Sequence, residues 1–225
     1  KLYWFILNFI NNNLPPKIPF YKNSIFIKNF KPELFDEDWS VLEKKISPSR
    51  MLCDLFWKKL NWNLLKKELG EINVFDTGCG NGKYGLILNN FAKGISSYRG
   101  VDTSPWDIWE KLSKEYPFLS YMEQKADNIN DDIPLNTNLF ITQSAIEHFK
   151  YDIEYFRNLK NFIKKDKRNT IQIHLLPAPP SLWIYLWHGV RQYNFQSINK
   201  IIDIFNDSDT QSYATLYRLG GNASN

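Results

Sequence analysis

The stretch "INVFDTGCGNGKYG", from Ile72 to Gly85, joins a short apolar segment to a turn that is rich in glycine. A glycine-rich bend directly after a strand lets a ligand approach the backbone closely. Gly78, Gly80 and Gly82 give the spacing G-x-G-x-G. This spacing differs from the dinucleotide fingerprint G-x-G-x-x-G, because Lys83 stands where the third glycine is needed. It also differs from a phosphate-binding P-loop, because Tyr84 follows Lys83 where a serine or threonine is required.

Outward from this stretch, short apolar runs alternate with segments of helical periodicity. We expect strands at 72–78, 97–104, 119–127, 139–145 and 170–176, helices at 82–91, 104–117, 151–165 and 197–205, and a late strand within 213–221. Ser104 is the expected cap of the second helix. This alternation predicts an α/β fold with a doubly wound, mostly parallel sheet.

The first seventy residues have a different character and predict an N-terminal helical cap. They read as irregular chain and then as helix, with Ser47 as N-cap and Pro48 at the first helical position. We therefore expect residues 1–70 to form a cap packed on a core of residues 71–225, within a single structural domain overall.

In open α/β sheets, ligands bind at the carboxyl ends of the strands. "VFDTGCGNG" at this edge resembles the first motif of the class I S-adenosylmethionine-dependent methyltransferases, and the resemblance extends over roughly 72–176. It implies a Rossmann-like methyltransferase fold, S-adenosyl-L-methionine as cofactor and S-adenosyl-L-homocysteine as product. The implied cofactor-binding residues are Asp76, Gly78, Cys79, Gly80 and Gly82 for the methionine part, Asp102 and Thr103 for the ribose, Asp127 and Asn128 for the adenine, and Gln143 and Ser144 near the methyl group.

Some of these positions have a second interpretation. Asp127 and Asn128 also suit a plain polar loop. Trp106, shortly after Asp102, either stacks on adenine or packs under the sheet, and we favour packing.

Transfer of a methyl group to an alcohol also needs a base near the acceptor. Among the three histidines we rank His148 first, His188 second and His174 third as catalytic candidates, with Glu147 orienting His148. His148 is alternatively a helix-start histidine bonded to backbone, and Glu147 a surface residue. No two histidines lie at metal-ligand spacing with a carboxylate, so no metal site is expected.

Three prolines interrupt the chain after the fifth strand, where a wall for the acceptor belongs. Trp183, Trp187, Arg191 and Tyr193 are the candidate substrate-binding residues, and the arginine suits an anionic acceptor. The alternative is a helix packed against the N-terminal region.

Composition restricts the partners. The chain has 225 residues, a net charge of +4 and no basic stripe with interleaved aromatics, so nucleic acid is not an expected partner. Two cysteines favour a cytoplasmic protein over a disulfide framework, and no apolar run reaches the ~20 residues of a membrane span. We expect a monomer or a homodimer.

These observations predict a methyltransferase of small polar acceptors. By family analogy, the reaction is O-methylation of a sugar or phosphorylated metabolite in cell-envelope polysaccharide or natural-product biosynthesis. The alternatives are a nucleic-acid methyltransferase, for example of RNA, and a non-catalytic binding module with the same fold.

Overall fold

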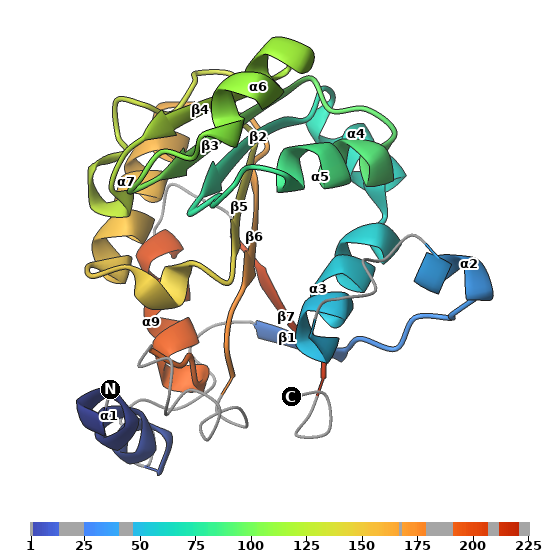
Figure 1. The fold of residues 1–225 in the computed structure, drawn as a ribbon. Helices are drawn as coiled ribbons and strands as arrows, with labels where there is room; N and C mark the ends of the chain where they lie inside the picture. Colours follow the sequence, from blue (N-terminus) through green and yellow to red (C-terminus); the bar gives the residue numbers. More distant parts are fainter. Residues whose placement is uncertain are drawn as a thin grey trace. The chain divides into compact units, whose positions relative to one another are not determined.

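The computed structural model describes residues 2–13, 25–40, 47–166, 168–178, 191–206 and 212–220. The chain forms two compact units (Figure 1). One consists of Lys1–Leu60 with Pro177–Asn225, and the other of Asn61–Leu176. No helix in the described ranges is both long and apolar enough to cross a bilayer.

The unit of Asn61–Leu176 is built on five parallel strands. They are β2 (Asn73–Thr77), β3 (Ser97–Asp102), β4 (Leu119–Glu123), β5 (Leu139–Gln143) and β6 (Ile171–Leu175), in the order β4-β3-β2-β5-β6. The winding direction therefore reverses between β2 and β5. This reversal is the topological switch point, beside which ligands bind in open α/β sheets.

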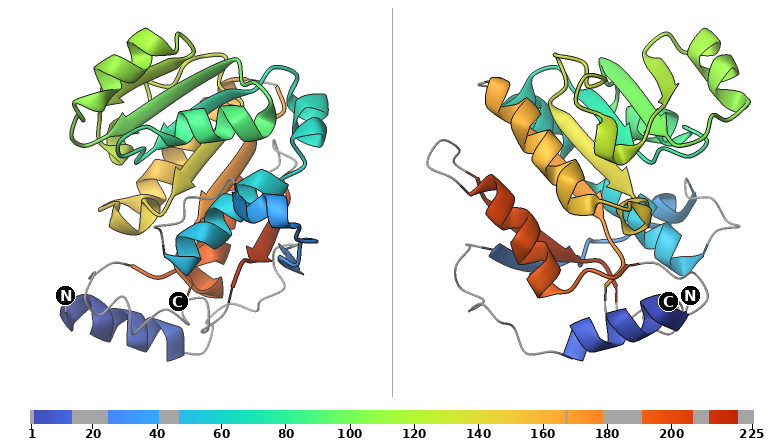
Figure 2. Two further views of the ribbon diagram at one scale, coloured as in Figure 1. Left: turned by 45° about the vertical axis from the view of Figure 1, so that its right-hand side comes forward. Right: turned by 90° about the vertical axis from the view of Figure 1, so that its left-hand side faces the viewer.

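Helices cover both faces of this sheet. They are α4 (Trp62–Leu69), α5 (Tyr84–Ala92), α6 (Ile108–Glu115) and α7 (Asp152–Lys165), with short 3-10 turns η1 (Ala126–Asn128) and η2 (Ile146–His148). Figure 2 shows α5 and α7 on opposite faces. The doubly wound, parallel α/β fold predicted from the sequence is confirmed.

The core of this unit follows from the apolar runs of its strands. All five residues of β2 and of β5 are buried, as expected for strands covered on both faces. On the α7 side, Phe75 contacts Phe140, and Phe140 contacts Phe162 of α7, with ring centroids 6.1 and 5.7 Å apart. On the α5 side, Gly85 lets the helix approach closely, since a Cβ there would lie 2.6 Å from Leu119 Cδ2.

The other unit combines both ends of the chain. Its elements are α1 (Leu2–Asn13), β1 (Ile25–Asn29), α2 (Asp36–Ser40), α3 (Pro48–Lys59), α9 (Phe195–Phe205) and β7 (Ala214–Arg218). Strand β7 pairs in parallel with β1. Asp38 joins α2 to α3 through ion pairs with Lys58 and Lys59. Asn8 Oδ1 of α1 accepts a hydrogen bond from the backbone N of Gln192 at 3.1 Å.

Several local predictions have a clear outcome. Ser47 caps α3, with its side chain accepting a hydrogen bond from Arg50 N, and Pro48 begins the helix, as predicted. The prediction that Ser104 caps the next helix is wrong, because α6 begins only at Ile108 and its N-cap Asp107 makes no side-chain capping bond. Strand β1 and helix α1 were not predicted. The expected boundary near residue 70 stays a prediction, while in the structure Pro177–Asn225 groups with the N-terminal residues.

Candidate active site

The glycine turn lies at the carboxyl end of β2, beside the switch point. Gly78, Gly80 and Gly82 have φ angles of 81°, 54° and 76°, in the left-handed region that favours glycine. Their surroundings differ. A Cβ at Gly78 would lie 2.4 Å from Ala145 Cβ and one at Gly82 would lie 2.2 Å from the Tyr121 ring, whereas at Gly80 nothing lies within 4 Å. Gly80 is thus the member of the motif that leaves room for a ligand.

Asp102, at the end of β3, contacts this open glycine directly. Its Oδ2 accepts a hydrogen bond from Gly80 N at 2.8 Å, and its Oδ1 accepts one from Thr103 N at 2.7 Å. Each carboxylate oxygen accepts more than one hydrogen bond. Asp102 therefore keeps the capacity to receive hydroxyl groups of a ligand beside Gly80.

Asp76 lies beneath the turn with only 2% of its surface exposed. Tyr98 Oη donates a hydrogen bond to Asp76 Oδ2 at 2.6 Å, while Oδ1 makes no hydrogen bond to any residue that the structure describes. Burial raises the pKa of this carboxyl to about 7, against the opposing effect of the Tyr98 hydrogen bond; the Asp102 charge raises it further. A buried carboxylate oxygen with unused acceptor capacity fits a cationic group of a ligand.

Cys79 packs within the glycine turn. Its side chain is buried, and a Cβ at Gly100 would lie 2.8 Å from its sulfur. Burial raises the pKa of the Cys79 thiol well above its ordinary value. Because the thiolate is the reactive form, this environment disfavours a nucleophilic role for Cys79.

Gln143 and Ser144 lie where β5 ends, across from the turn. The Gln143 side-chain amide donates a hydrogen bond to the Tyr84 hydroxyl, which links β5 to the start of α5. Ser144 is exposed and has a φ of 50°. A non-glycine residue in this region costs on the order of 1 kcal/mol, and such residues cluster at functional sites.

Glu147 and His148 follow on η2, in different environments. Glu147 is buried, whereas His148 is exposed and its backbone N donates to Ala145 O at 2.9 Å. His174, the third-ranked candidate, lies within β6 with Nδ1 3.0 Å from Thr142 Oγ1. Burial lowers the pKa of His174 to about 3, so this ring is neutral at physiological pH.

The predicted adenine-side residues lie on η1 and before α6. Asp127 is half-buried and its carbonyl accepts a hydrogen bond from Asn158 Nδ2, while Asn128 is exposed. The preference for Trp106 as a packing residue is wrong, since this side chain is 51% exposed. Because α6 begins after Trp106, the buried position belongs to Trp109, which is 7% exposed.

The predicted acceptor wall lies in the other unit. Trp183, Trp187 and His188 are outside the described residues. Arg191 is half-buried, and Tyr193 is 2% exposed with its backbone N bonded to Pro177 O.

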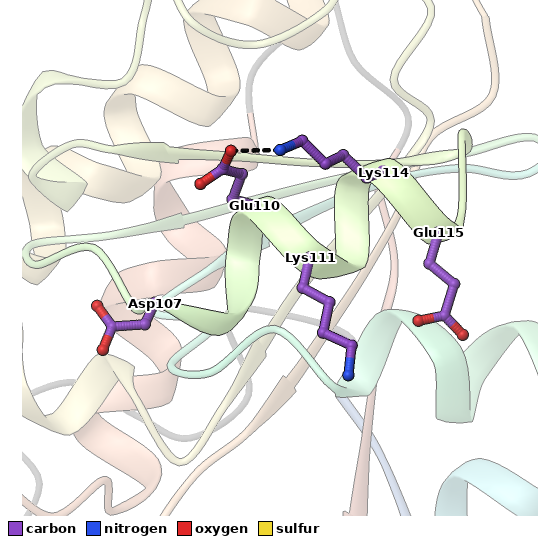
Figure 3. Close-up of a pocket in the computed structure, with 5 residues that line it drawn as sticks. All are labelled: Asp107, Glu110, Lys111, Lys114 and Glu115. Carbon is purple, nitrogen blue, oxygen red and sulfur yellow. Dashed lines mark hydrogen bonds and ion pairs between the residues drawn. The ribbon is translucent and has the colours of Figure 1, made fainter.

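A shallow cavity of about 470 Å³ lies elsewhere, on α6 (Figure 3). Its lining consists of Asp107, Glu110, Lys111, Lys114 and Glu115. These are charged side chains of one helix and its N-cap, two of which form an exposed Glu110–Lys114 ion pair, and none is a predicted site residue. No group of three or more potential metal-ligating side chains occurs in the described part of the chain.

Sequence reasoning missed three aromatic residues that shape the site: Tyr98, Trp109 and Tyr121. They lie on a strand or an amphipathic helix, where aromatic side chains ordinarily indicate core. The useful signal was Gly100, a glycine inside a predicted strand, which indicates close approach of another group.

Strand order, parallel pairing and a glycine turn at the switch point together decide the fold. This is the fold of the class I S-adenosylmethionine-dependent methyltransferases. No protein-family model and no curated protein matches the chain.

Solved structures similar to this chain include three proteins of low identity. Magnesium protoporphyrin IX methyltransferase from Synechocystis PCC 6803 is 15% identical, with a TM-score of 0.49, over 74% of this chain and 77% of that protein. The YcgJ protein from Bacillus subtilis is 16% identical, with a TM-score of 0.45, over 63% and 65%. The plantazolicin methyltransferase BamL, solved with S-adenosylhomocysteine, is 16% identical, with a TM-score of 0.46, over 69% and 62%. This chain thus spans less than two thirds of the length of the last two.

Proposed function

We propose that this chain is an S-adenosylmethionine-dependent methyltransferase that acts on a small polar acceptor. The observation that carries the proposal is the direct bond between the amide of Gly80, the open glycine, and Asp102. Beneath the same turn lies Asp76, whose Oδ1 has no hydrogen-bond partner in the described structure. A nucleoside that also carries an ammonium group matches this set of groups.

The site residues have distinct roles in this proposal. Gly80 admits the ligand to the backbone, Asp102 accepts its ribose hydroxyls, and Asp76 faces its ammonium group. Asp127 and Asn128 lie on the adenine side, and Gln143 and Ser144 on the methyl side. When bound, the cofactor supplies an activated methyl group on a sulfonium.

The acceptor side of the proposal rests on exposed His148. A base at this position takes the proton of an acceptor hydroxyl, while buried Glu147 orients the ring. Alignment and exclusion of water supply the remainder of the acceleration. We propose O-methylation for this reason, with a sugar or phosphorylated metabolite as acceptor.

Titration calorimetry with S-adenosylmethionine and S-adenosylhomocysteine tests the cofactor assignment. We expect saturable binding of both, with a large loss of affinity in Asp102→Ala. Absence of binding at millimolar ligand contradicts the proposed function. Loss of affinity in a control, Lys67→Ala, which changes an exposed side chain of α4, would indicate that the effect is not specific to the site.

Transfer assays with radiolabelled cofactor then separate the acceptor classes. We expect His148→Ala to bind cofactor normally and to transfer methyl groups about 10²- to 10⁴-fold more slowly, the range for loss of a general base. Binding without transfer to any member of a small-molecule panel favours a binding module. Transfer to RNA that weakens steeply with salt favours a nucleic-acid enzyme.

A further inference from the structure

Two aromatic side chains hold the carbonyl groups of the glycine turn. Trp109 Nε1 of α6 donates a hydrogen bond to Gly80 O at 2.9 Å, and Tyr121 Oη of β4 donates one to Gly82 O at 2.9 Å. The two rings stack on each other, with centroids 5.4 Å apart and planes 13° apart. Both donors are thus fixed relative to each other as well as to the turn.

Two glycines make room for the Tyr121 ring. A Cβ at Gly82 would lie 2.2 Å from Tyr121 Cε1, and a Cβ at Gly100 would lie 2.8 Å from Tyr121 Cδ1. Burial raises the pKa of the Tyr121 hydroxyl, so it remains protonated and able to donate. The absence of a side chain at Gly82 therefore makes room for an aromatic ring.

These bonds determine how Gly80 is presented. Its amide points to Asp102 Oδ2 and its carbonyl to Trp109 Nε1, so both of its backbone polar groups have fixed partners. Its Cα side remains open, with nothing within 4 Å of a Cβ placed there. The orientation of the open residue thus depends on α6 and β4, which lie outside the motif.

We propose that Trp109 and Tyr121 are positioning residues, which hold the turn in the conformation that receives the cofactor. This inference rests on the proposed function. If the two rings were only part of the core, removal of their polar atoms alone would leave cofactor affinity unchanged, since the rings would still pack.

The test uses two variants. Tyr121→Phe keeps the ring and removes its hydroxyl donor, whereas Trp109→Phe keeps an aromatic ring but loses the indole N–H together with part of the stacked ring system. We expect each to bind S-adenosylhomocysteine about three- to tenfold more weakly, as for loss of one neutral hydrogen bond. The matched control is Ser120→Ala, which loses a bond from Ser120 Oγ to Tyr98 O on the same strand, away from the turn. We expect its affinity to change less than twofold. Equal affinity of both phenylalanine variants and the wild-type protein overturns the inference.

An NMR measurement on the wild-type protein tests the same inference if a variant does not fold. The indole N–H resonance of Trp109 is identified by its absence in Trp109→Phe, or by selective labelling. We expect it to shift and to exchange more slowly with solvent when S-adenosylhomocysteine binds, because its acceptor is the Gly80 carbonyl. A resonance that does not move at saturation overturns the positioning role. Absence of binding by the wild-type protein would contradict the proposed function itself.

Discussion

At the scale of single residues, the three glycines of the G-x-G-x-G motif have three different surroundings. Gly78 allows close packing against Ala145, Gly82 accommodates Tyr121, and Gly80 has open space at its side. A motif read as one ligand-binding feature is thus a packing device at its two ends. Open space for a ligand is found at the central glycine, whose amide donates to Asp102.

This division predicts a selective effect of Gly80→Ala. The added methyl group points into open space, so the free energy of unfolding falls mainly by the cost of a left-handed backbone at alanine, about 1–2 kcal/mol. The same methyl group occupies the space that the ligand needs. We expect calorimetry to show affinity for S-adenosylhomocysteine at least about tenfold weaker, from contacts worth more than about 1.4 kcal/mol.

The control for this variant is Gly94→Ala. Gly94 has a φ of 103° and also has nothing within 4 Å of a Cβ position, but it lies after α5. We expect comparable or greater loss of stability in thermal unfolding with unchanged affinity. If both variants lose affinity equally, backbone strain rather than obstruction explains the effect.

The motif residues were accessible to sequence reasoning because spacing alone marks them. Asp76 and Asp102 lie near the carboxyl ends of readable strands, and Gly80 lies in the turn after the first of them. The parallel sheet brings such positions to one edge. Tyr98, Trp109 and Tyr121 were not identified, since apart from Gly100 nothing in the local sequence distinguishes an aromatic side chain that bonds to a distant turn from one that fills the core.

At the scale of elements, the side chain of Asn138, directly before β5, fixes the positions at which β2 and β5 begin. Its Oδ1 accepts a hydrogen bond from Asn73 N at 2.9 Å, and its Nδ2 donates to Leu69 O and to Glu71 O. Asn138 thereby joins the end of α4, the start of β2 and the start of β5. The Asn138 amide can make all of these bonds because it both donates and accepts.

We expect Asn138→Ala to lower the free energy of unfolding by about 2–4 kcal/mol, because one buried and two part-buried backbone groups lose their partner. Chemical denaturation measures this loss. Asn136→Ala is the control, since it removes one bond from an exposed side chain to Asn73 Oδ1, and a change below about 1 kcal/mol is expected. Equal losses in the two variants would contradict a special role of Asn138.

The start of α3 offers a second prediction at this scale. Ser47→Ala removes the bond from Arg50 N to Ser47 Oγ and is expected to cost about 1 kcal/mol. Ser47→Asp keeps an acceptor at the N-cap and is expected to restore most of that stability in the same denaturation series. No difference between the two variants would show that the cap is energetically unimportant.

The elements themselves were largely predictable, with physical reasons for the exceptions. The wholly buried strands β2 and β5 read as short apolar runs, whereas the less buried β3, β4 and β6 were found from the alternation of strands with helices. Helix α1 is apolar without a regular polar face, and β1 follows a proline-rich stretch, so neither gave a local signal. The pairing of β1 with β7 joins positions almost two hundred residues apart, which no local pattern encodes.

At the scale of the whole molecule, the buried carboxyl of Asp76 couples folding to pH. Its pKa is raised from 3.8 to about 7, first by burial. Between these values the folded protein holds a proton that the unfolded chain releases. Stability is therefore expected to fall as pH rises from about 4 to about 7, and to level off above that range.

The measurement is the difference in unfolding free energy between wild type and Asp76→Asn across this range. Taking the difference removes the contribution of other titrating groups, which is the same in both proteins. As pH rises, we expect Asp76→Asn to become more stable relative to the wild-type protein by on the order of a few kcal/mol. A difference that stays constant from pH 4 to pH 8 would show that Asp76 is ionised in the folded protein throughout.

Ligand binding is expected to reverse this trend, since a cationic group favours the ionised carboxylate. Between pH 5.5 and 7 the α-amino group of S-adenosylhomocysteine stays protonated, given an ordinary pKa of about 8. Binding in this range must therefore expel a proton from Asp76, so affinity should rise with pH by up to about tenfold per unit and level off near pH 7. Calorimetry in buffers of different ionisation enthalpy detects the released proton, and Asp76→Asn should bind weakly with no such dependence. If the affinity of the wild-type protein does not change across this range and no proton is released, Asp76 does not bind the ammonium group. Asp102 would then be the carboxylate that binds the ligand.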